Sequence, residues 1–384
     1  MGLSKRERVL CTLELGGEPD VVPIFNSGFE QSGTSFQYYL KSKERKENTM
    51  WVKPNLKKAK FSITEQRFWS VDAYCIDPFG SKLRFKREKA PPEYPNSQIN
   101  PISGKIYKNV KQIETGLDYV WYVDGYFTTP ERRYSCWEKF GRPSELINDR
   151  VNYSPQIWED FVEILSPYFY PLATLPIAPH EALFEGMTIM KAAYYMKKTP
   201  QFIHEIMAEY AKTNIEIVKR LGEAGVEIAF MYDDLGYKGR SIFSIEKFKE
   251  FILPYYQKIY DACNKRGMLI IQHSCGYIDK LLPYMVNAGL NAVEALEPAA
   301  GVDLAHLKDT LGDHLCFIGG IDASEILNFG TPNDVDQEVK RCIKAAAQGG
   351  GYFAGPSHNI LNAPWENILA LKSAIEKYRK YPLN

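Results

Sequence analysis

Short apolar runs and amphipathic helical segments alternate along the chain from about residue 155 onward. The helical segments carry apolar residues three and four positions apart, whereas the runs are short and continuous, as expected of buried parallel strands. The runs cover residues 171–178, 227–232, 268–272, 292–296, 316–319 and 352–354. Near the amino terminus, a capping box of Ser4 and Glu7 predicts a helix, and residues 21–25 are expected to form a further strand.

This repeated order of strand and helix predicts a (β/α)8 TIM barrel. A doubly wound sheet is the alternative. Its glycine-rich phosphate loop would follow a strand, whereas Gly349, Gly350 and Gly351 precede one. No linker divides the chain, so residues 1–384 are expected to form a single domain.

Residues 75–130 break this pattern because they are rich in Tyr, Pro and Gly and contain short alternating runs. They predict an aromatic-rich antiparallel insertion or lid within the barrel domain. Its rings, among them Tyr119, Trp121 and Tyr122, could line a pocket for an aromatic substrate. The favoured alternative is a β-hairpin that packs on the barrel.

The composition argues against nucleic acid and membranes as partners. Lys plus Arg and Asp plus Glu both number 47, so no basic excess exists to release counterions from a nucleic acid. No apolar stretch approaches the roughly 18 residues that span a bilayer, and the amino terminus lacks the apolar core of a signal peptide. The seven cysteines show no paired spacing, which indicates a reducing, cytoplasmic compartment.

A candidate metal site follows the apolar run at residues 268–272. His273 and Cys275 are two positions apart, so on a strand their side chains point to the same side and can bind one ion. His358 ends the run that begins at Tyr352 and is the expected third ligand. Such N, S and N ligands leave a fourth position open, as in catalytic zinc sites, and they favour zinc over magnesium or calcium. The alternative is a core histidine beside a buried thiol.

Acidic residues at other strand ends could orient a ligand histidine, complete the metal shell or act as a base. They are Asp233, Asp234, Glu294, Glu297 and Asp322. The alternative for any one of them is a structural role such as a helix cap. His180 follows another strand-like run and could also reach the site. No GxSxG or GxxxxGK[ST] motif occurs, which argues against a serine hydrolase and a nucleotide hydrolase.

Five segments resemble the uroporphyrinogen decarboxylase superfamily, along nearly the whole chain. They are residues 8–25 (RVLCTLELGGEPDVVPIF), 231–259 (MYDDLGYKGRSIFSIEKFKEFILPYYQKI), 270–276 (IIQHSCG), 315–327 (LCFIGGIDASEIL) and 349–371 (GGGYFAGPSHNILNAPWENILAL). The resemblance implies a TIM barrel. It also implies one of two functions, because the superfamily contains haem-pathway decarboxylases and zinc methyltransferases that exchange methyl groups with corrinoid proteins or coenzyme M.

The segment after the first strand separates the two groups. In the decarboxylases an arginine-bearing loop binds the substrate's carboxylates, whereas residues 24–30 here contain no arginine. The methyltransferase group resembles this chain in its H-x-C-G motif, which His273, Cys275 and Gly276 match. Its third zinc ligand is a cysteine, and the matching position here holds His358.

One thiolate fewer makes zinc a stronger Lewis acid, which suits a methyl ether better than a thiol. The resemblance therefore implies an O-demethylase component that moves a methyl group from a small donor, such as a methoxyarene, to a separate corrinoid protein. Asp234, Glu294 or Glu297 would position the donor or complete the zinc shell. The partner would carry the corrinoid (cobalamin), because no region of this chain looks like a cobalamin-binding domain. Three alternatives stay open: a decarboxylase-like lyase, a methylcobamide:thiol methyltransferase of the coenzyme M type, and a barrel that only binds a ligand or partner.

Overall fold

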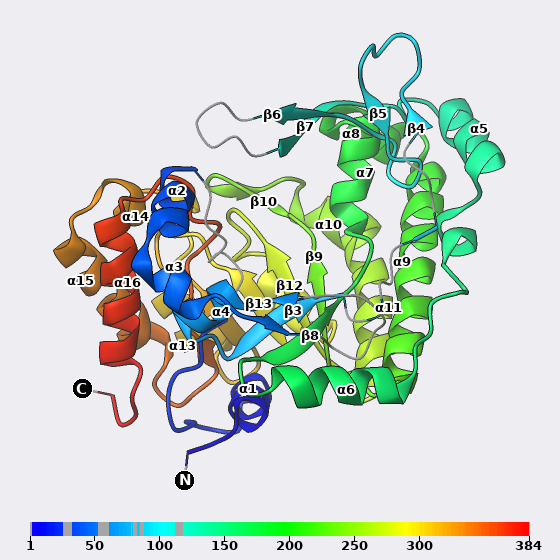
Figure 1. Ribbon diagram of the computed structural model, residues 1–384. Helices are drawn as coiled ribbons and strands as arrows, with labels where there is room; N and C mark the ends of the chain where they lie inside the picture. Colours follow the sequence, from blue (N-terminus) through cyan, green and yellow to red (C-terminus); the bar gives the residue numbers. More distant parts are fainter. Residues whose placement is uncertain are drawn as a thin grey trace.

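The computed structural model describes residues 2–25, 33–52, 61–77, 79, 83–84, 88–111 and 118–383 (Figure 1). Residues 26–30, which belong to the segment without arginine, lie outside this described part, as do some residues of the predicted insertion. Among the described helices, none combines the length and the apolar character needed to cross a membrane.

A curled parallel sheet forms the centre of the molecule. Its seven strands follow the order β15-β14-β13-β12-β9-β8-β3. Their bounds are β3 (Ala73–Ile76), β8 (Tyr170–Thr174), β9 (Ile228–Tyr232), β12 (Leu269–Ser274), β13 (Ala292–Ala295), β14 (Cys316–Gly319) and β15 (Tyr352–Phe353). Isolated parallel bridges join Ile24 to Ala354, next to β15, and Phe25 to Ala73, in β3. Both edges of the sheet therefore meet the segment predicted as the first strand, and the fold is TIM-barrel-like.

Helices pack around this sheet, and several begin where local sequence signals predict. The Ser4–Glu7 capping box opens α1, and Thr331 caps α15 with Pro332 at its first position. The helices are α1 (Lys5–Leu13), α2 (Gly33–Lys41), α3 (Lys43–Asn48), α4 (Thr64–Trp69), α5 (Pro130–Phe140), α6 (Pro155–Leu165), α7 (Pro179–Met187), α8 (Ile189–Lys198), α9 (Pro200–Glu223), α10 (Ile245–Phe251), α11 (Leu253–Asn264), α12 (Leu282–Asn287), α13 (Leu304–Leu311), α14 (Ile326–Phe329), α15 (Pro332–Ala346) and α16 (Trp365–Tyr378). Two short hairpins, β1 (Trp51–Val52) with β2 (Phe61–Ser62) and β10 (Gly236–Tyr237) with β11 (Arg240–Ser241), complete the described strands outside the two larger sheets.

A separate antiparallel sheet lies within residues 75–130. Its order is β4 (Glu88–Lys89), β5 (Gln98–Ile99), β6 (Lys105–Lys111) and β7 (Asp118–Gly125). The β6–β7 hairpin contacts α7, where the N–H of Phe127 donates to the carbonyl of Gly186. The aromatic residues divide between two environments, since Phe127 and Trp137 are buried whereas Tyr119 and Trp121 are exposed.

Large apolar side chains fill the inside of the curled sheet. Phe25 and Phe230 stack with their ring centroids 5.6 Å apart, and Phe353 meets Phe25 edge-on at 6.1 Å. All three side chains are buried. The interior is therefore a packed core, so a functional site must lie at its end.

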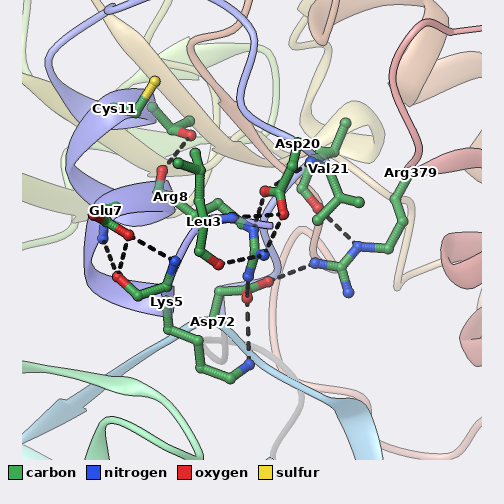
Figure 2. A network of polar contacts seen from close by, with 12 residues as sticks. Leu3, Lys5, Glu7, Arg8, Cys11, Asp20, Val21, Asp72 and Arg379 are labelled. Atoms are coloured by element: carbon green, nitrogen blue, oxygen red, sulfur yellow. Dashed lines mark hydrogen bonds and ion pairs between the residues drawn. The ribbon is translucent and has the colours of Figure 1, made fainter. Parts of the chain in front are cut away.

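A buried ionic network ties the two ends of the chain to the start of β3 (Figure 2). Asp72 is 1% exposed and accepts hydrogen bonds from Arg8 and Arg379, both at 2.6 Å, and from Lys5 at 3.3 Å. The N–H of Ile24 also donates to this carboxylate. Burial alone would raise the pKa of Asp72, but the three cations and the Ile24 N–H outweigh it and lower that pKa. Asp72 thereby joins α1, the segment at Ile24 and the end of α16 to the start of β3.

Candidate metal centre

The candidate metal residues stand at the ends of three neighbouring strands. In β12, His273 pairs in register with Tyr232 of β9 on one side and with Glu294 of β13 on the other. Cys275 follows β12 directly, and Asp234 lies two residues beyond the end of β9. Because adjacent strands lie about 4.8 Å apart, side chains from these three ends can reach a common point.

The side chains of Asp234, His273 and Cys275 converge there. The Nε2 atom of His273 is 3.3 Å from the Oδ1 atom of Asp234 and 3.3 Å from the Sγ atom of Cys275. One ligand atom from each residue lies within 4.8 Å of the other two. The three residues are partly buried, so the cluster is not sealed within the core. The expected pair His273 and Cys275 is thus brought together, with a carboxylate as its nearest third donor.

Glu294 holds the other side of the His273 ring. Its carboxylate contacts the Nδ1 atom and is 1% exposed. Burial works against a charged imidazole, but the negative charge of Glu294 and hydrogen bonds to Asp234, Cys275 and Glu294 raise the pKa of His273 well above its ordinary value. A carboxylate behind a histidine fixes the ring orientation and leaves the opposite nitrogen for a metal.

The loop after β12 is held by backbone donors and by close glycine packing. The Cys275 N–H donates to Asp234 Oδ1 at 2.8 Å, and the Gly276 N–H donates to Glu297 Oε2 at 3.1 Å. Gly276 has a φ of +78°, and a Cβ atom there would lie 2.4 Å from the carbonyl carbon of Gly236. The glycine of the H-x-C-G motif is therefore required by backbone contact as well as by conformation.

His180 and Asp233 support the cluster from behind. The Nδ1–H of His180 donates to the carbonyl of Asp234 at 2.6 Å, and burial lowers the pKa of His180 to about 4. Asp233 accepts from the backbone N–H groups of His180 and Glu181 and from Tyr256, and burial raises its pKa well above the ordinary value. Of the two adjacent aspartates, Asp233 therefore anchors the start of α7, whereas the side chain of Asp234 faces the cluster.

His358 is not part of this group in the described structure. Its Nε2 atom lies 2.7 Å from the hydroxyl of Ser324, and its Nδ1 atom lies 3.0 Å from the carbonyl of Asn359. The described residues bring nitrogen, sulfur and oxygen donors together, and His358 as a ligand stays a prediction. Asp322 accepts the N–H groups of Ser324 and Glu325 in the turn before α14, whose N-cap is Glu325 and which has no side-chain cap.

Glu181 is a neighbour of the centre that the sequence patterns did not single out. Burial, together with the charges of Glu185 and Asp234, raises the pKa of Glu181 to about 7. The one feature of the sequence that could have indicated Glu181 is its position directly after His180, at the start of α7.

The donor set fits a zinc ion. Imidazole nitrogen, thiolate sulfur and carboxylate oxygen are the three ligand types that zinc takes in proteins, and a set of three leaves a place for substrate. A cleft of about 360 Å3 reaches Cys275 and is lined in part by Tyr237, Lys238, Glu297 and Glu325. The strand ends therefore offer both ligands and an adjoining space.

Known proteins with similar sequences fall into two enzyme groups. A methylated-thiol–coenzyme M methyltransferase of Methanosarcina mazei is 25% identical over 209 residues, which are 54% of this chain and 52% of that protein. A methylcobamide:CoM methyltransferase of the same organism is 25% identical over 170 residues, which are 44% of this chain and 47% of that protein. A uroporphyrinogen decarboxylase of Chlorobium phaeovibrioides is 22% identical over 173 residues, which are 43% and 46% of the two chains. The chain thus spans about half the length of the curated relatives it matches.

The fold and the family profile extend this likeness. A solved structure described as a methyltransferase from Methanosarcina mazei superposes with a TM-score of 0.60 over 98% of this chain and 99% of the other, at 15% identity, which shows a common fold. The profile of the family described as uroporphyrinogen decarboxylase (URO-D) matches residues 171–378, which include the whole cluster. Since that match covers more than half of the sequence, the chain belongs to the uroporphyrinogen decarboxylase (URO-D) family.

Proposed function

We propose that this chain is a zinc-dependent methyltransferase that moves a methyl group from a small methyl ether, such as a methoxyarene, to a corrinoid carried by a partner protein. The observation that carries the proposal is the convergence of His273, Cys275 and Asp234 at adjacent strand ends. The coenzyme M methyltransferases among the relatives support methyl transfer as the class of reaction.

His273, Cys275 and Asp234 would hold the ion, and each is prepared for that role by a neighbour. Glu294 orients the His273 ring, and the Cys275 N–H together with His180 fixes Asp234. Zinc in this set would supply Lewis acidity toward the ether oxygen of the donor. Glu297 restrains the loop that carries Cys275 and lines the adjoining cleft, where it would position the donor.

The choice of an ether over a thiol rests on the ligand chemistry. The cluster contains one thiolate donor, one imidazole and one carboxylate, which donate less charge to zinc than a thiolate-rich set. A less electron-rich ion polarises an oxygen more strongly and suits a bound thiolate less. His358 remains a proposed further ligand, and it would have to leave Ser324 to reach the ion.

Methyl transfer to a thiol of the coenzyme M type is the second candidate. It is favoured by two relatives, the methylated-thiol–coenzyme M methyltransferase and the methylcobamide:CoM methyltransferase of Methanosarcina mazei. A decarboxylase-like reaction is the third, favoured by the relative from Chlorobium phaeovibrioides. Two experiments separate these candidates.

The first experiment measures bound metal in purified wild type and in Cys275→Ala, Asp234→Ala and His358→Ala. Cys11→Ala and His314→Ala serve as matched controls, because Cys11 and His314 stand outside the cluster. We expect about one zinc per chain in wild type and both controls, as for a mononuclear site, and its loss from Cys275→Ala and Asp234→Ala. Zinc retained by Cys275→Ala would show that the centre is misplaced, and a metal-free active decarboxylase would establish the third candidate.

The second experiment measures the reaction itself. A methoxyarene and free cob(I)alamin are incubated with the zinc-loaded chain, and methylcobalamin is followed by its absorption spectrum. A parallel sample contains methylcobalamin and coenzyme M. We expect turnover in the first sample. Turnover in the second sample alone would replace the ether by a thiol as the methyl-exchange partner.

A further inference from the structure

Exposed apolar side chains concentrate on one part of the surface. Of the 17 large hydrophobic residues that are exposed among the described residues, nine lie on the β6–β7 hairpin and on α8. We call these nine the hairpin patch: Val110, Tyr119, Val120, Trp121, Tyr122, Val123, Ile189, Met190 and Tyr194. Scattered single apolar residues are ordinary on a surface, whereas a continuous group marks a binding site.

The strand β7 is exposed in a way that an isolated protein normally avoids. It is the last strand of its sheet, and its residues 118–123 are all exposed. Edge strands are commonly protected by lysine or proline, but the sequence of β7, DYVWYVDG, contains neither. The strand therefore offers aromatic rings and backbone groups to another molecule.

Three residues of the hairpin patch, Tyr122 of the hairpin and Ile189 and Met190 of α8, line a common cavity together with Asp124 and Glu185. A space of about 460 Å3 separates Tyr122 of the hairpin from Phe184, Ile189 and Met190 at the junction of α7 and α8. Met190 is 83% exposed at its edge. A side chain from a partner could enter this space and contact both elements at once.

The hairpin patch is connected to the metal centre through α7. At the start of this helix, the N–H groups of His180 and Glu181 donate to Asp233, the residue before Asp234. Toward its end, Glu185 forms an ion pair with Lys105 of β6. Along α7, His180 and Glu181 are five and four residues from Glu185, and five residues span about 8 Å of a helix. Figure 1 shows the hairpin projecting on the same side of the barrel as β10, which follows Asp234 closely in the sequence.

The charges around the hairpin patch are mostly positive. The exposed charged residues of β6, β7 and α8, within the described part of the chain, are Lys108, Lys111, Asp118, Lys191, Lys197 and Lys198. A second copy of this chain would set these lysines against one another, whereas a partner with carboxylates around an apolar face would pair with them.

We propose that the hairpin patch is the docking surface for the corrinoid-bearing partner, and that the partner meets it with an apolar face rimmed by acidic residues. The assignment of the corrinoid to that partner rests on the proposed function. A partner seated on the patch would lie beside the strand ends that carry His273 and Cys275, as transfer of a methyl group between two proteins requires. The aromatic rings supply the apolar contacts and the lysines orient the encounter.

Photocrosslinking in the full-length chain tests this proposal. The crosslinker p-benzoylphenylalanine is placed at Trp121, which is 57% exposed, and in a control chain at Phe329, a ring on α14 outside the patch that is 80% exposed. Each chain is irradiated in an extract of the organism that encodes it, and the purified adducts are analysed for cobalt and for peptide identity. We expect a cobalt-containing protein adduct at Trp121, acidic at the crosslinked site, and none at Phe329.

Charge reversal provides the second readout. The double substitution Lys191→Glu and Lys198→Glu should reduce the cobalt-containing adduct several-fold, and added salt should reduce it in wild type, because surface charges are screened. Lys43→Glu, at an exposed lysine on α3, should leave the yield unchanged. An adduct with a second copy, with nucleic acid or with a cobalt-free protein would overturn the proposal, and so would the absence of any adduct.

Failure of this proposal is distinguishable from failure of the proposed function. Transfer from a methoxyarene to free cob(I)alamin needs no docking surface, so it should be equal in wild type and in the double variant Lys191→Glu and Lys198→Glu. If that transfer occurs while no cobalt-containing adduct forms, the docking surface is wrong and the function stands. If that transfer is absent even from zinc-loaded wild type, the function is wrong.

Discussion

His273 contacts the buried carboxylate of Glu294 through Nδ1, from the position directly opposite on the neighbouring strand. The contact turns the Nε2 atom toward Asp234 and Cys275. Strand register therefore decides which nitrogen of the ring is available to an ion.

Replacing Glu294 by glutamine should weaken zinc binding about 10- to 100-fold, the usual effect of losing a carboxylate behind a ligand histidine. The amide keeps the size of the Glu294 side chain but removes the negative charge that contacts the His273 ring. Competition with a chromogenic chelator measures the affinity. Glu376→Gln, at an exposed pair on α16, is the control and should bind zinc as wild type does. An unchanged affinity in Glu294→Gln would mean that Glu294 does not support the metal.

Gly276→Ala should damage both the fold and zinc binding, whereas Gly239→Ala should affect the fold mildly. Both glycines have positive φ angles, +78° and +71°, but an added Cβ meets backbone atoms at Gly276 and nothing within 4 Å at Gly239. The conformational cost alone is about 1 kcal/mol, so the difference between the two variants isolates the contact with Gly236. Thermal unfolding and zinc content measure it. Equal behaviour of the two variants would contradict a required close approach.

Asp72→Asn should destabilise the protein by about 3–5 kcal/mol near pH 7, because Lys5, Arg8 and Arg379 all lose the negative charge of this buried carboxylate. The pKa of Asp72 is lowered in the folded state, so the stability it contributes is present above its unfolded pKa of about 3.9. That stability is lost as the pH falls through the lower folded pKa.

Denaturant unfolding at several pH values measures this effect. In wild type the free energy of unfolding should fall as the pH is lowered below about 4, and in Asp72→Asn this fall should be smaller. Asp118→Asn, at an exposed residue of β7, should change neither the free energy of unfolding nor its pH dependence. A variant as stable as wild type at pH 7 would show that the network contributes little.

Asp279→Asn should stabilise the protein at neutral pH. The Oδ1 atom of Asp279 is buried without a hydrogen-bond partner among the described residues, and burial raises the pKa of this carboxyl to about 6. A raised folded pKa means that stability falls as the pH rises from about 4 to 6, and the cost persists above that range. Because the group is partly exposed, we expect a gain of about 1 kcal/mol from the neutral amide.

Unfolding at pH 4 and pH 7 tests this sign. The gain should shrink at pH 4, where wild type is protonated. Asp309→Asn, at an exposed position on α13, should give no gain at either pH. A loss of stability at pH 7 in Asp279→Asn would show that its charge is compensated.

Much of the framework could be predicted from local sequence, because local physical rules govern it. The capping signals at Ser4 and Thr331 depend on residues three positions apart, and the apolar runs mark strands that are covered on both faces. His273 and Cys275 could be paired for the same reason, since side chains two apart on a strand share a side. The TIM-barrel-like fold follows from repeating such units.

Tertiary structure decided which of the candidate donors lies beside His273 and Cys275. The strand order places β9 and β13 on either side of β12. Asp234 therefore meets the loop at Cys275 across 41 positions of sequence, and Glu294 meets His273 across 21. His358 follows β15, three strands from β12, and it instead meets Ser324, after the neighbouring strand β14. The sequence by itself identified the candidate metal-binding residues. The order and register of the strands decided which of them lie together, because hydrogen bonding between strands brings distant segments to one edge.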